Sequence, residues 1–176
     1  MLVRNLAILL LSKIKPFHND EMLQRWILDL ITDYKIKTFF ETGTFRAGSL
    51  KWIAKRKPEL DCISVESERE YYVFSKIRTA FMKNIKLIHG DSVLALNNYV
   101  TSIQSDKLTL YWLDAHWNII NPLKEELKVI SCSKKPSIII IDDIEDFDST
   151  FIYQDFKKII EPEKYVKKYI TIMDAI

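Results

Sequence analysis

The segment from Glu41 to Ser49 has the residue types of a ligand-binding loop. It reads ETGTFRAGS and contains two of the three glycines of the chain. Gly43 would let the backbone approach a ligand closely, and Gly48 would let a following helix begin tightly. The carboxylate of Glu41 stands where a dinucleotide-binding loop has its first glycine, and it would repel a pyrophosphate. The loop therefore suits a cationic ligand, such as a sulfonium or an amino group, better than a dinucleotide.

Acidic residues stand at the ends of five apolar segments that we predict to be strands. In open parallel sheets, ligands bind beyond the carboxyl ends of the strands. One acid at such a place is uninformative because acids are common in loops, but five at one edge favour a binding rim. These acids are Glu41, Glu66, Asp91, Asp114 and the pair Asp142 and Asp143.

Two of these acids suit the ribose and the base of a nucleoside. Glu66 ends the second predicted strand, roughly 20 residues after the loop, where a carboxylate can accept hydrogen bonds from ribose hydroxyls. Asp91 follows Gly90 and could accept a hydrogen bond from an adenine amino group. Because Glu68 and Glu70 follow closely, Glu66 could instead be a solvated loop acid. We favour the ribose role.

The elements that must position these residues alternate between strand and helix. Apolar spacing predicts helices at 21–32 (with Asn19 or Asp20 as N-cap), 49–57, 68–81, 92–103, from Pro122 onward and at 151–160. Strands are predicted at 37–40, 61–65, 85–88, 108–113, 137–141 and 165–173. This order predicts a parallel sheet with helices on both faces. The segment 137–141 reads SIIII, which is typical of a strand buried on both sides.

The composition narrows the class of protein. The chain has 176 residues, 48% of them hydrophobic, and a net charge of +2, which fits one domain and requires neither nucleic acid nor a membrane as partner. Cys62 and Cys132 lack metal-ligand spacing and are too few for a disulfide framework, which favours a cytoplasmic location. The apolar run at 6–11 is shorter than the roughly 20 residues of a membrane span. We expect it to pack on the domain as a helix, with a targeting segment as the alternative.

The ordered motifs resemble those of class I S-adenosylmethionine-dependent methyltransferases. The loop Glu41–Leu50 resembles their motif I, and especially the pattern E-x-G-T-[FY]-x-[GA]-x-S of the cation-dependent catechol and caffeoyl-coenzyme A O-methyltransferases. Tyr111–Trp117 is similar to that group's strand followed by Leu-Asp and His-Trp, and Ile138–Asp143 to its next strand. The arrangement also resembles the macrocin O-methyltransferase group, and the resemblance covers residues 37–147.

The resemblance implies an α/β fold: a Rossmann-like three-layer sandwich with a mostly parallel central sheet. We expect one methyltransferase-like domain over 1–176, with an N-terminal helical segment (1–35), a cofactor-binding core (36–147) and a C-terminal helix and strand (148–176). The residues after Asp143 have room for one helix and one strand only. The last strand is therefore expected to be missing, with a truncated chain or completion by a partner chain as explanations.

The resemblance also implies a ligand for each group of residues. S-adenosylmethionine would be bound by Glu41, Gly43, Thr44, Phe45, Gly48, Ser49, Glu66, Asp91, Ser92 and Asp114. One Mg²⁺ would be held by Asp114, Asp142 and Asp143, because hard cations prefer oxygen ligands. Asp114 and His116 would be catalytic, with His116 as general base. The catechol enzymes use a lysine just after the His-Trp pair, and Asn118 stands there in this chain.

The predicted function is methyl transfer to the hydroxyl of a small molecule or a glycan, assisted by a divalent cation. Two alternatives stay open: a non-catalytic interaction module with the same sheet, and an NAD-dependent oxidoreductase, against which Glu41 argues. The acceptor and the oligomeric state, a homodimer included, are left open by the sequence.

Overall fold

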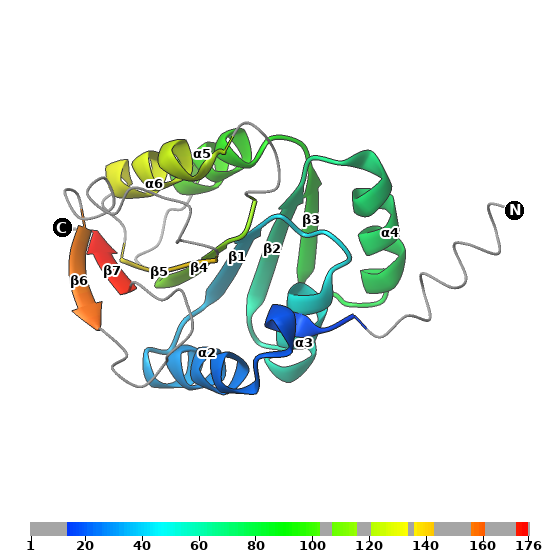
Figure 1. The fold of residues 1–176 in the computed structure, drawn as a ribbon, viewed down its shortest axis with the longest axis horizontal. Helices are drawn as coiled ribbons and strands as arrows, with labels where there is room; N and C mark the ends of the chain where they lie inside the picture. The colour runs from blue at the N-terminus through cyan, green and yellow to red at the C-terminus, as the bar shows by residue number, and fades with distance from the viewer. Residues whose placement is uncertain are drawn as a thin grey trace, which may run out of the picture.

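The computed structural model describes residues 14–102, 107–115, 121–133 and 136–142, and the backbone of 156–160 and 172–175. The elements alternate along the chain as predicted (Figure 1). The helices are η1 (Pro16–Asn19), α2 (Glu21–Asp33), α3 (Gly48–Arg56), α4 (Arg69–Thr79), α5 (Ser92–Ser102) and α6 (Leu123–Cys132). The strands are β1 (Thr38–Thr42), β2 (Asp61–Glu66), β3 (Ile85–His89), β4 (Thr109–Leu113), β5 (Ser137–Ile141), β6 (Phe156–Ile160) and β7 (Ile172–Ala175).

Five strands form one sheet in the order β3-β2-β1-β4-β5, and every neighbouring pair is parallel. All residues of β1, β4 and β5 are buried, as expected for strands covered on both faces. Because the strands run in the same direction, their carboxyl ends meet at one edge of the sheet. The predicted Rossmann-like α/β fold is therefore confirmed.

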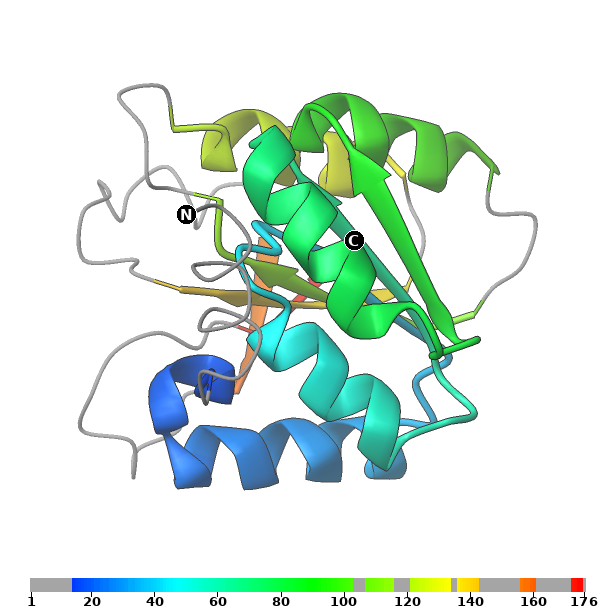
Figure 2. The same cartoon turned by 90° about the vertical axis from the view of Figure 1, so that its right-hand side faces the viewer.

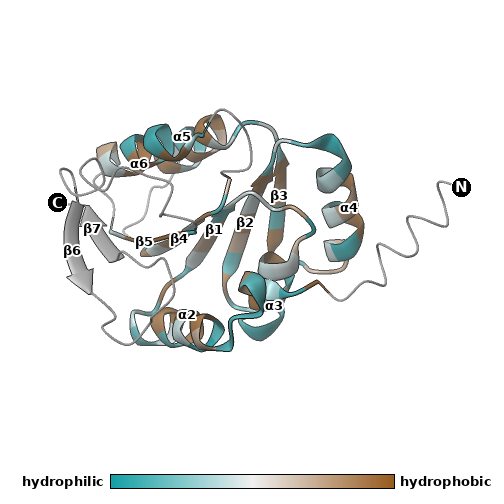
Figure 3. Cartoon of the chain, viewed as in Figure 1, coloured by the Kyte–Doolittle hydropathy of each residue, from teal (hydrophilic) through white to brown (hydrophobic). Residues whose placement is uncertain are grey.

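Two layers of helices cover the sheet and give it two separate cores. Helices α2 and α3 lie on one face and α5 and α6 on the other, as Figure 2 shows. Phe39 and Trp112 point into the core under α2 and α3, whereas Phe40 and Tyr111 point into the core under α5 and α6. The apolar residues in Figure 3 are concentrated on the strands and on the helix sides that face them. This alternation follows from the two-residue period of a strand.

The helix boundaries follow the predicted signals. Of the two candidate N-caps for α2, the structure selects Asp20, whose carboxylate accepts hydrogen bonds from the N–H groups of Met22 and Leu23, both at 2.9 Å. Pro58 follows the end of α3 closely. No helix in the described ranges has both the length and the hydrophobicity needed to cross a membrane.

The C-terminal part corrects the sequence analysis. The predicted helix at 151–160 is wrong at 156–160, where the backbone forms β6 and pairs with β7 in antiparallel fashion. Only the end of the strand predicted at 165–173 overlaps β7. Short apolar runs such as this one fit a helix or a strand equally well, and pairing between distant segments decides. Strands β6 and β7 form a separate two-stranded sheet, and β7 lies beside β5 (Figure 1). Two strands are therefore present where one helix and one strand were predicted.

Candidate cofactor and cation site

The end of β1 places the buried carboxylate of Glu41 under the rim of the sheet. The Ser64 hydroxyl donates a hydrogen bond to Glu41 Oε2 at 2.6 Å and lies 2.6 Å from the Thr44 hydroxyl. Burial raises the pKa of Glu41 well above its usual value, the Ser64 hydrogen bond opposes that rise, and the nearby charges of Asp114 and Glu66 add to it. A cation bound beside Glu41 would favour its ionised form. Its role toward a cationic ligand stays a prediction.

Glu66 links the end of β2 to the same loop. Its Oε2 accepts a hydrogen bond from the Phe45 N–H at 2.7 Å, and its Oε1 accepts one from the Glu68 N–H at 2.9 Å. Glu66 is buried, with 6% of its surface exposed, so it is not a solvated loop acid, and this burial raises its pKa. Each carboxylate oxygen can accept more than one hydrogen bond, which leaves capacity for the hydroxyls of a ligand.

The fold itself requires a glycine at position 43, and the predicted approach of a ligand stays a prediction. Its φ is +81°, and a Cβ built there would lie 2.3 Å from the backbone oxygen of Asp114. The space beside Gly43 is therefore filled by the end of β4 and not kept open for a ligand. Gly48 begins α3 as expected, and a Cβ there would lie 2.7 Å from the Ile14 side chain. Its lack of a side chain makes room for the N-terminal segment.

The remaining loop residues face in different directions. Thr44 is buried, whereas Phe45 has a φ of +48° and leaves its ring 47% exposed beside Tyr71, with centroids 4.6 Å apart. The Ser75 hydroxyl donates to the Phe45 carbonyl at 2.8 Å. Ser49 Oγ accepts a hydrogen bond from the Phe17 N–H at 3.0 Å. The loop is thus fixed by hydrogen bonds to Ser75 of α4 and to Phe17 of η1.

Asp91 and Ser92 lie where β3 passes into α5. Asp91 Oδ1 accepts a hydrogen bond from the Leu94 N–H at 2.8 Å and so caps that helix. Asp91 is exposed and keeps a second oxygen. Its role toward an adenine stays a prediction.

The ends of β4 and β5 bring two of the predicted cation ligands together. The backbone N–H of Asp114 donates to the Thr42 carbonyl at 3.1 Å, and that of Asp142 donates to the Leu113 carbonyl at 3.0 Å. His18 Nε2 lies 2.6 Å from Asp142 Oδ2. Ligand atoms of His18, Asp114 and Asp142 all lie within 4.8 Å of one another. The predicted ligand Asp143 and the predicted base His116 lie outside the described residues.

The donors of this cluster fit a divalent cation. Carboxylate oxygens suit hard cations, and a neutral imidazole nitrogen suits transition ions. His18 is not among the ligands predicted from the sequence, because it lies far from the strand ends in the sequence. Two signals could have found it: His18 stands just before the cap of α2, and that helix leads directly into β1.

A second residue that the sequence analysis missed is Glu126 on α6. It is fully buried, its Oε2 accepts a hydrogen bond from the Thr42 hydroxyl at 3.4 Å, and within the described residues its Oε1 has no hydrogen-bond partner. Burial raises its pKa to about 7, and the Ser92 and Thr42 hydrogen bonds act against the rise. The signal was an acid inside the apolar stripe of the helix formed by Leu123, Leu127 and Ile130.

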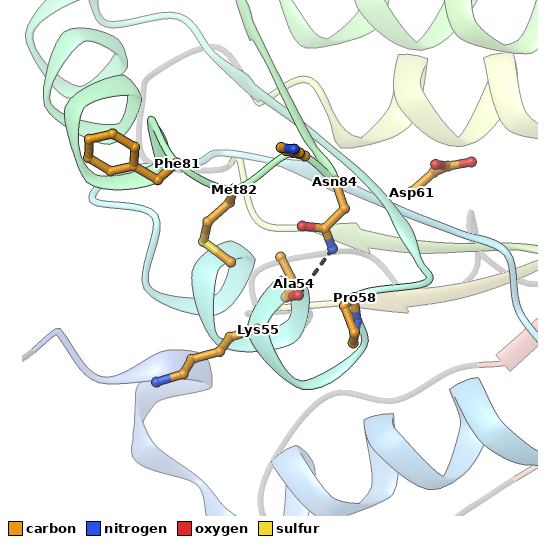
Figure 4. Close-up of a pocket in the computed structure, with 8 residues that line it drawn as sticks. Ala54, Lys55, Pro58, Asp61, Phe81, Met82 and Asn84 are labelled. Atoms are coloured by element: carbon orange, nitrogen blue, oxygen red, sulfur yellow. Dashed lines mark hydrogen bonds between the residues drawn. The ribbon is translucent and has the colours of Figure 1, made fainter.

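A cavity of about 530 Å³ lies at the opposite edge of the sheet. Figure 4 shows that it lies between the end of α3 and the start of β2, with Phe81, Met82 and Asn84 on its other side. Asn84 Nδ2 donates to the Ala54 carbonyl at 3.0 Å, and Phe81 is 99% exposed. Because β2 begins at Asp61 there, the cavity is separate from the rim where the carboxylates meet.

Comparison with known proteins supports the fold. No protein-family profile and no curated protein matches the sequence. Among solved structures, the chain is similar to a protein named as a caffeoyl-CoA O-methyltransferase from Staphylococcus aureus, with 16% identity over 88% of this chain and 83% of that one and a TM-score of 0.66. It is also similar to the S-adenosylhomocysteine-bound methyltransferase PaMTH1 from Podospora anserina, with 16% identity over 84% and 75% and a TM-score of 0.61. A third is the O-methyltransferase TomG from Streptomyces achromogenes in complex with S-adenosylmethionine, with 18% identity over 69% and 55% and a TM-score of 0.53.

The chain therefore shares the fold of these solved methyltransferase structures. Within the methyltransferase fold, the predicted binding residues of the first loop, Glu66 and Asp114 gather at one edge of the sheet. Gly43 lies against the backbone of Asp114, and the Phe45 N–H reaches Glu66. The central geometric expectation of the sequence analysis, a shared rim of strand ends, is therefore confirmed.

Proposed function

We propose that this protein is an S-adenosylmethionine-dependent methyltransferase that methylates a hydroxyl of a small molecule or a glycan with the help of a divalent cation. The observation that carries the proposal is the position of the buried carboxylate of Glu41, beneath the loop that joins β1 to α3 and close to Glu66 and Asp114. A pyrophosphate would be repelled there, whereas a sulfonium would be stabilised. Two of the similar structures contain S-adenosylhomocysteine or S-adenosylmethionine, which supports the same ligand.

Each end of the cofactor has a matching group on the rim. Glu66 would accept hydrogen bonds from the ribose hydroxyls, and Asp91 would accept one from the adenine amino group. Glu41 would provide negative potential below the sulfonium and the amino group. These contacts would hold the methyl carbon in line with an acceptor oxygen, which is the main requirement of a displacement on an activated carbon.

The cation part of the proposal rests on Asp114 and Asp142. A divalent cation, when bound, would lower the pKa of an acceptor hydroxyl and orient it. Asp114 and Asp142 would hold the ion at the ends of neighbouring strands, beside the cofactor rim. Asp143 as a further ligand, His116 as general base, Mg²⁺ as the ion and the chemical nature of the acceptor stay predictions.

Calorimetric titration of the full chain tests the cofactor part directly. We expect S-adenosylmethionine and S-adenosylhomocysteine to bind and NAD to give no heat. Glu66→Gln should weaken the binding of both by about tenfold, since a charged acceptor of ribose hydroxyls becomes neutral and loses acceptor capacity. The exposed neighbour Glu70→Gln is the control and should leave affinity unchanged. Binding of NAD, or no heat with either nucleoside, would refute the proposal.

A further inference from the structure

We propose that His18 is a direct ligand of the cation held by Asp114 and Asp142, and that the site therefore takes a transition ion such as Mn²⁺ in preference to Mg²⁺. The inference deepens the proposed function and rests on its cation part. It replaces an all-carboxylate site at the ends of β4 and β5 by a mixed site to which the N-terminal segment contributes.

The geometry of the three side chains supports a shared ion. They come from three separate parts of the chain: the short helix η1, the end of β4 and the end of β5. One donor atom of each lies within 4.8 Å of the other two. Donor atoms bound to one ion at about 2.1 Å lie roughly 3 to 4 Å apart. A small rotation of the side chains is therefore enough to close all three around an ion.

The backbone next to His18 is anchored through the neighbouring residue Phe17. The Phe17 ring is buried and meets the rings of Trp112 and Trp52 edge-on, with centroids 4.9 and 5.8 Å apart. The Phe17 N–H donates to Ser49 Oγ at 3.0 Å. His18, by contrast, keeps its side chain 59% exposed while its Nε2 reaches Asp142. An anchored backbone segment thus places an imidazole nitrogen beside Asp142 at the rim.

The nitrogen donor changes which ion the site prefers. Mg²⁺ is held mainly by oxygen ligands and retains several waters, whereas imidazole is a good ligand for transition ions. Mn²⁺ accepts both carboxylates and imidazole, so the set of His18, Asp114 and Asp142 suits it well. An ion bound by these residues would also link the segment around His18 to the ends of β4 and β5, next to the loop that precedes α3.

Pulsed electron paramagnetic resonance of the Mn²⁺-loaded full chain tests the proposal without measuring catalysis. We expect the wild-type protein to show the nitrogen coupling of a directly bound imidazole. His18→Ala should lose this coupling and bind Mn²⁺ at least tenfold more weakly, while its Mg²⁺ affinity changes less than threefold. His89→Ala is the matched control, because His89 is exposed at the end of β3, and it should keep both signals. Unchanged thermal unfolding of His18→Ala would show that the fold is intact.

Two outcomes would overturn the proposal. If His18→Ala keeps the nitrogen coupling and the Mn²⁺ affinity, His18 is not a ligand. If the wild-type chain does not bind Mn²⁺ at millimolar concentration, there is no such site. Titration with S-adenosylmethionine separates these failures from a failure of the proposed function, since cofactor binding can persist in both cases.

Discussion

The two halves of the rim are held in different ways. On the β1–β2 side, the carboxylates of Glu41 and Glu66 accept hydrogen bonds from Ser64 and from backbone N–H groups of the adjoining loops. On the β4–β5 side, the backbone groups of Asp114 and Asp142 are fixed by neighbouring strands, and the Asp142 carboxylate meets a residue 124 positions away in the sequence.

The β1–β2 side of the rim is therefore preorganised, whereas the β4–β5 side depends on packing between segments far apart in the sequence. The β1–β2 side is built from one loop and the next strand, so its geometry follows from local sequence. The β4–β5 side requires the N-terminal segment to fold back across the start of α3, where Gly48 makes room for Ile14. We therefore expect changes on the first side to alter cofactor binding or folding and changes on the second side to alter cation binding.

The largest effect is expected for Gly43→Val. The new side chain would meet the Asp114 backbone at 2.3 Å and would have to adopt a φ of +81°, so we expect a loss of at least about 4 kcal/mol in the free energy of unfolding. Thermal and denaturant unfolding without cofactor measures it. Gly90→Ala is the control, because Gly90 also has a positive φ but no atom within 4 Å of its Cβ position; we expect a smaller cost, about 2 kcal/mol from backbone strain alone. A stable Gly43→Val protein that only fails to bind cofactor would restore the original explanation.

The next effect concerns Glu126, which is buried against the end of β1. Its pKa is about 7 in the folded protein against a usual value of 4.5, so the folded state holds the proton more tightly. Its contribution to stability is complete below pH 4.5 and is lost as the pH rises through 7. From pH 5 to pH 8, Glu126→Gln should therefore gain on the order of 3 kcal/mol in unfolding free energy relative to wild type. If the unfolding free energies of Glu126→Gln and wild type change in parallel with pH, the prediction is wrong. The exposed Glu125→Gln is the control and should run parallel to wild type.

Asp142→Asn tests whether the two halves can be separated. The neutral amide is a weaker cation ligand, so we expect cation-stimulated methyl transfer to fall by about 100-fold. Affinity for S-adenosylmethionine should change by less than threefold, because the cofactor contacts lie on the β1–β2 side. Glu66→Gln is the control on the other side of the rim. It should bind the cofactor more weakly and keep its Mn²⁺ affinity. Wild-type activity that is unaffected by a chelator would remove the cation from the mechanism.

The sequence predicts the parts of the molecule that depend on local pattern. The parallel sheet could be predicted from the alternation of elements and from the apolar segment Ser137–Ile141. The residues on the β1–β2 side could be predicted from the first loop. The close contact of Gly43 with the backbone of Asp114 was not predicted, because that neighbour follows β4 and lies outside the local sequence. The strand β6 was predicted as a helix because only its pairing with β7 distinguishes the two.

The missed residues share a physical cause. His18 and Glu126 are brought to the rim by helix packing, and neither stands at the end of a strand. A single sequence carries no record of such packing. The unusual feature of Glu126 is a carboxylate within an apolar helical stripe, which a search for buried acids could find. For His18 the local sequence offers its place before the cap of α2 and the direct passage of that helix into β1.

The smallest effect is expected for Ser64→Ala, which tests how the preorganised half works. The Ser64 hydrogen bond lowers the pKa of Glu41 against the effect of burial, so its removal should raise that pKa further and leave less of the carboxylate ionised. We expect affinity for S-adenosylmethionine to fall by about fivefold, near 1 kcal/mol, and to recover partly as the pH rises. Calorimetry across pH 6 to 9 measures both. Ser67→Ala, at an exposed position just beyond β2, should match wild type. If Ser64→Ala shows the same pH profile as wild type, Glu41 does not attract the cofactor through its charge.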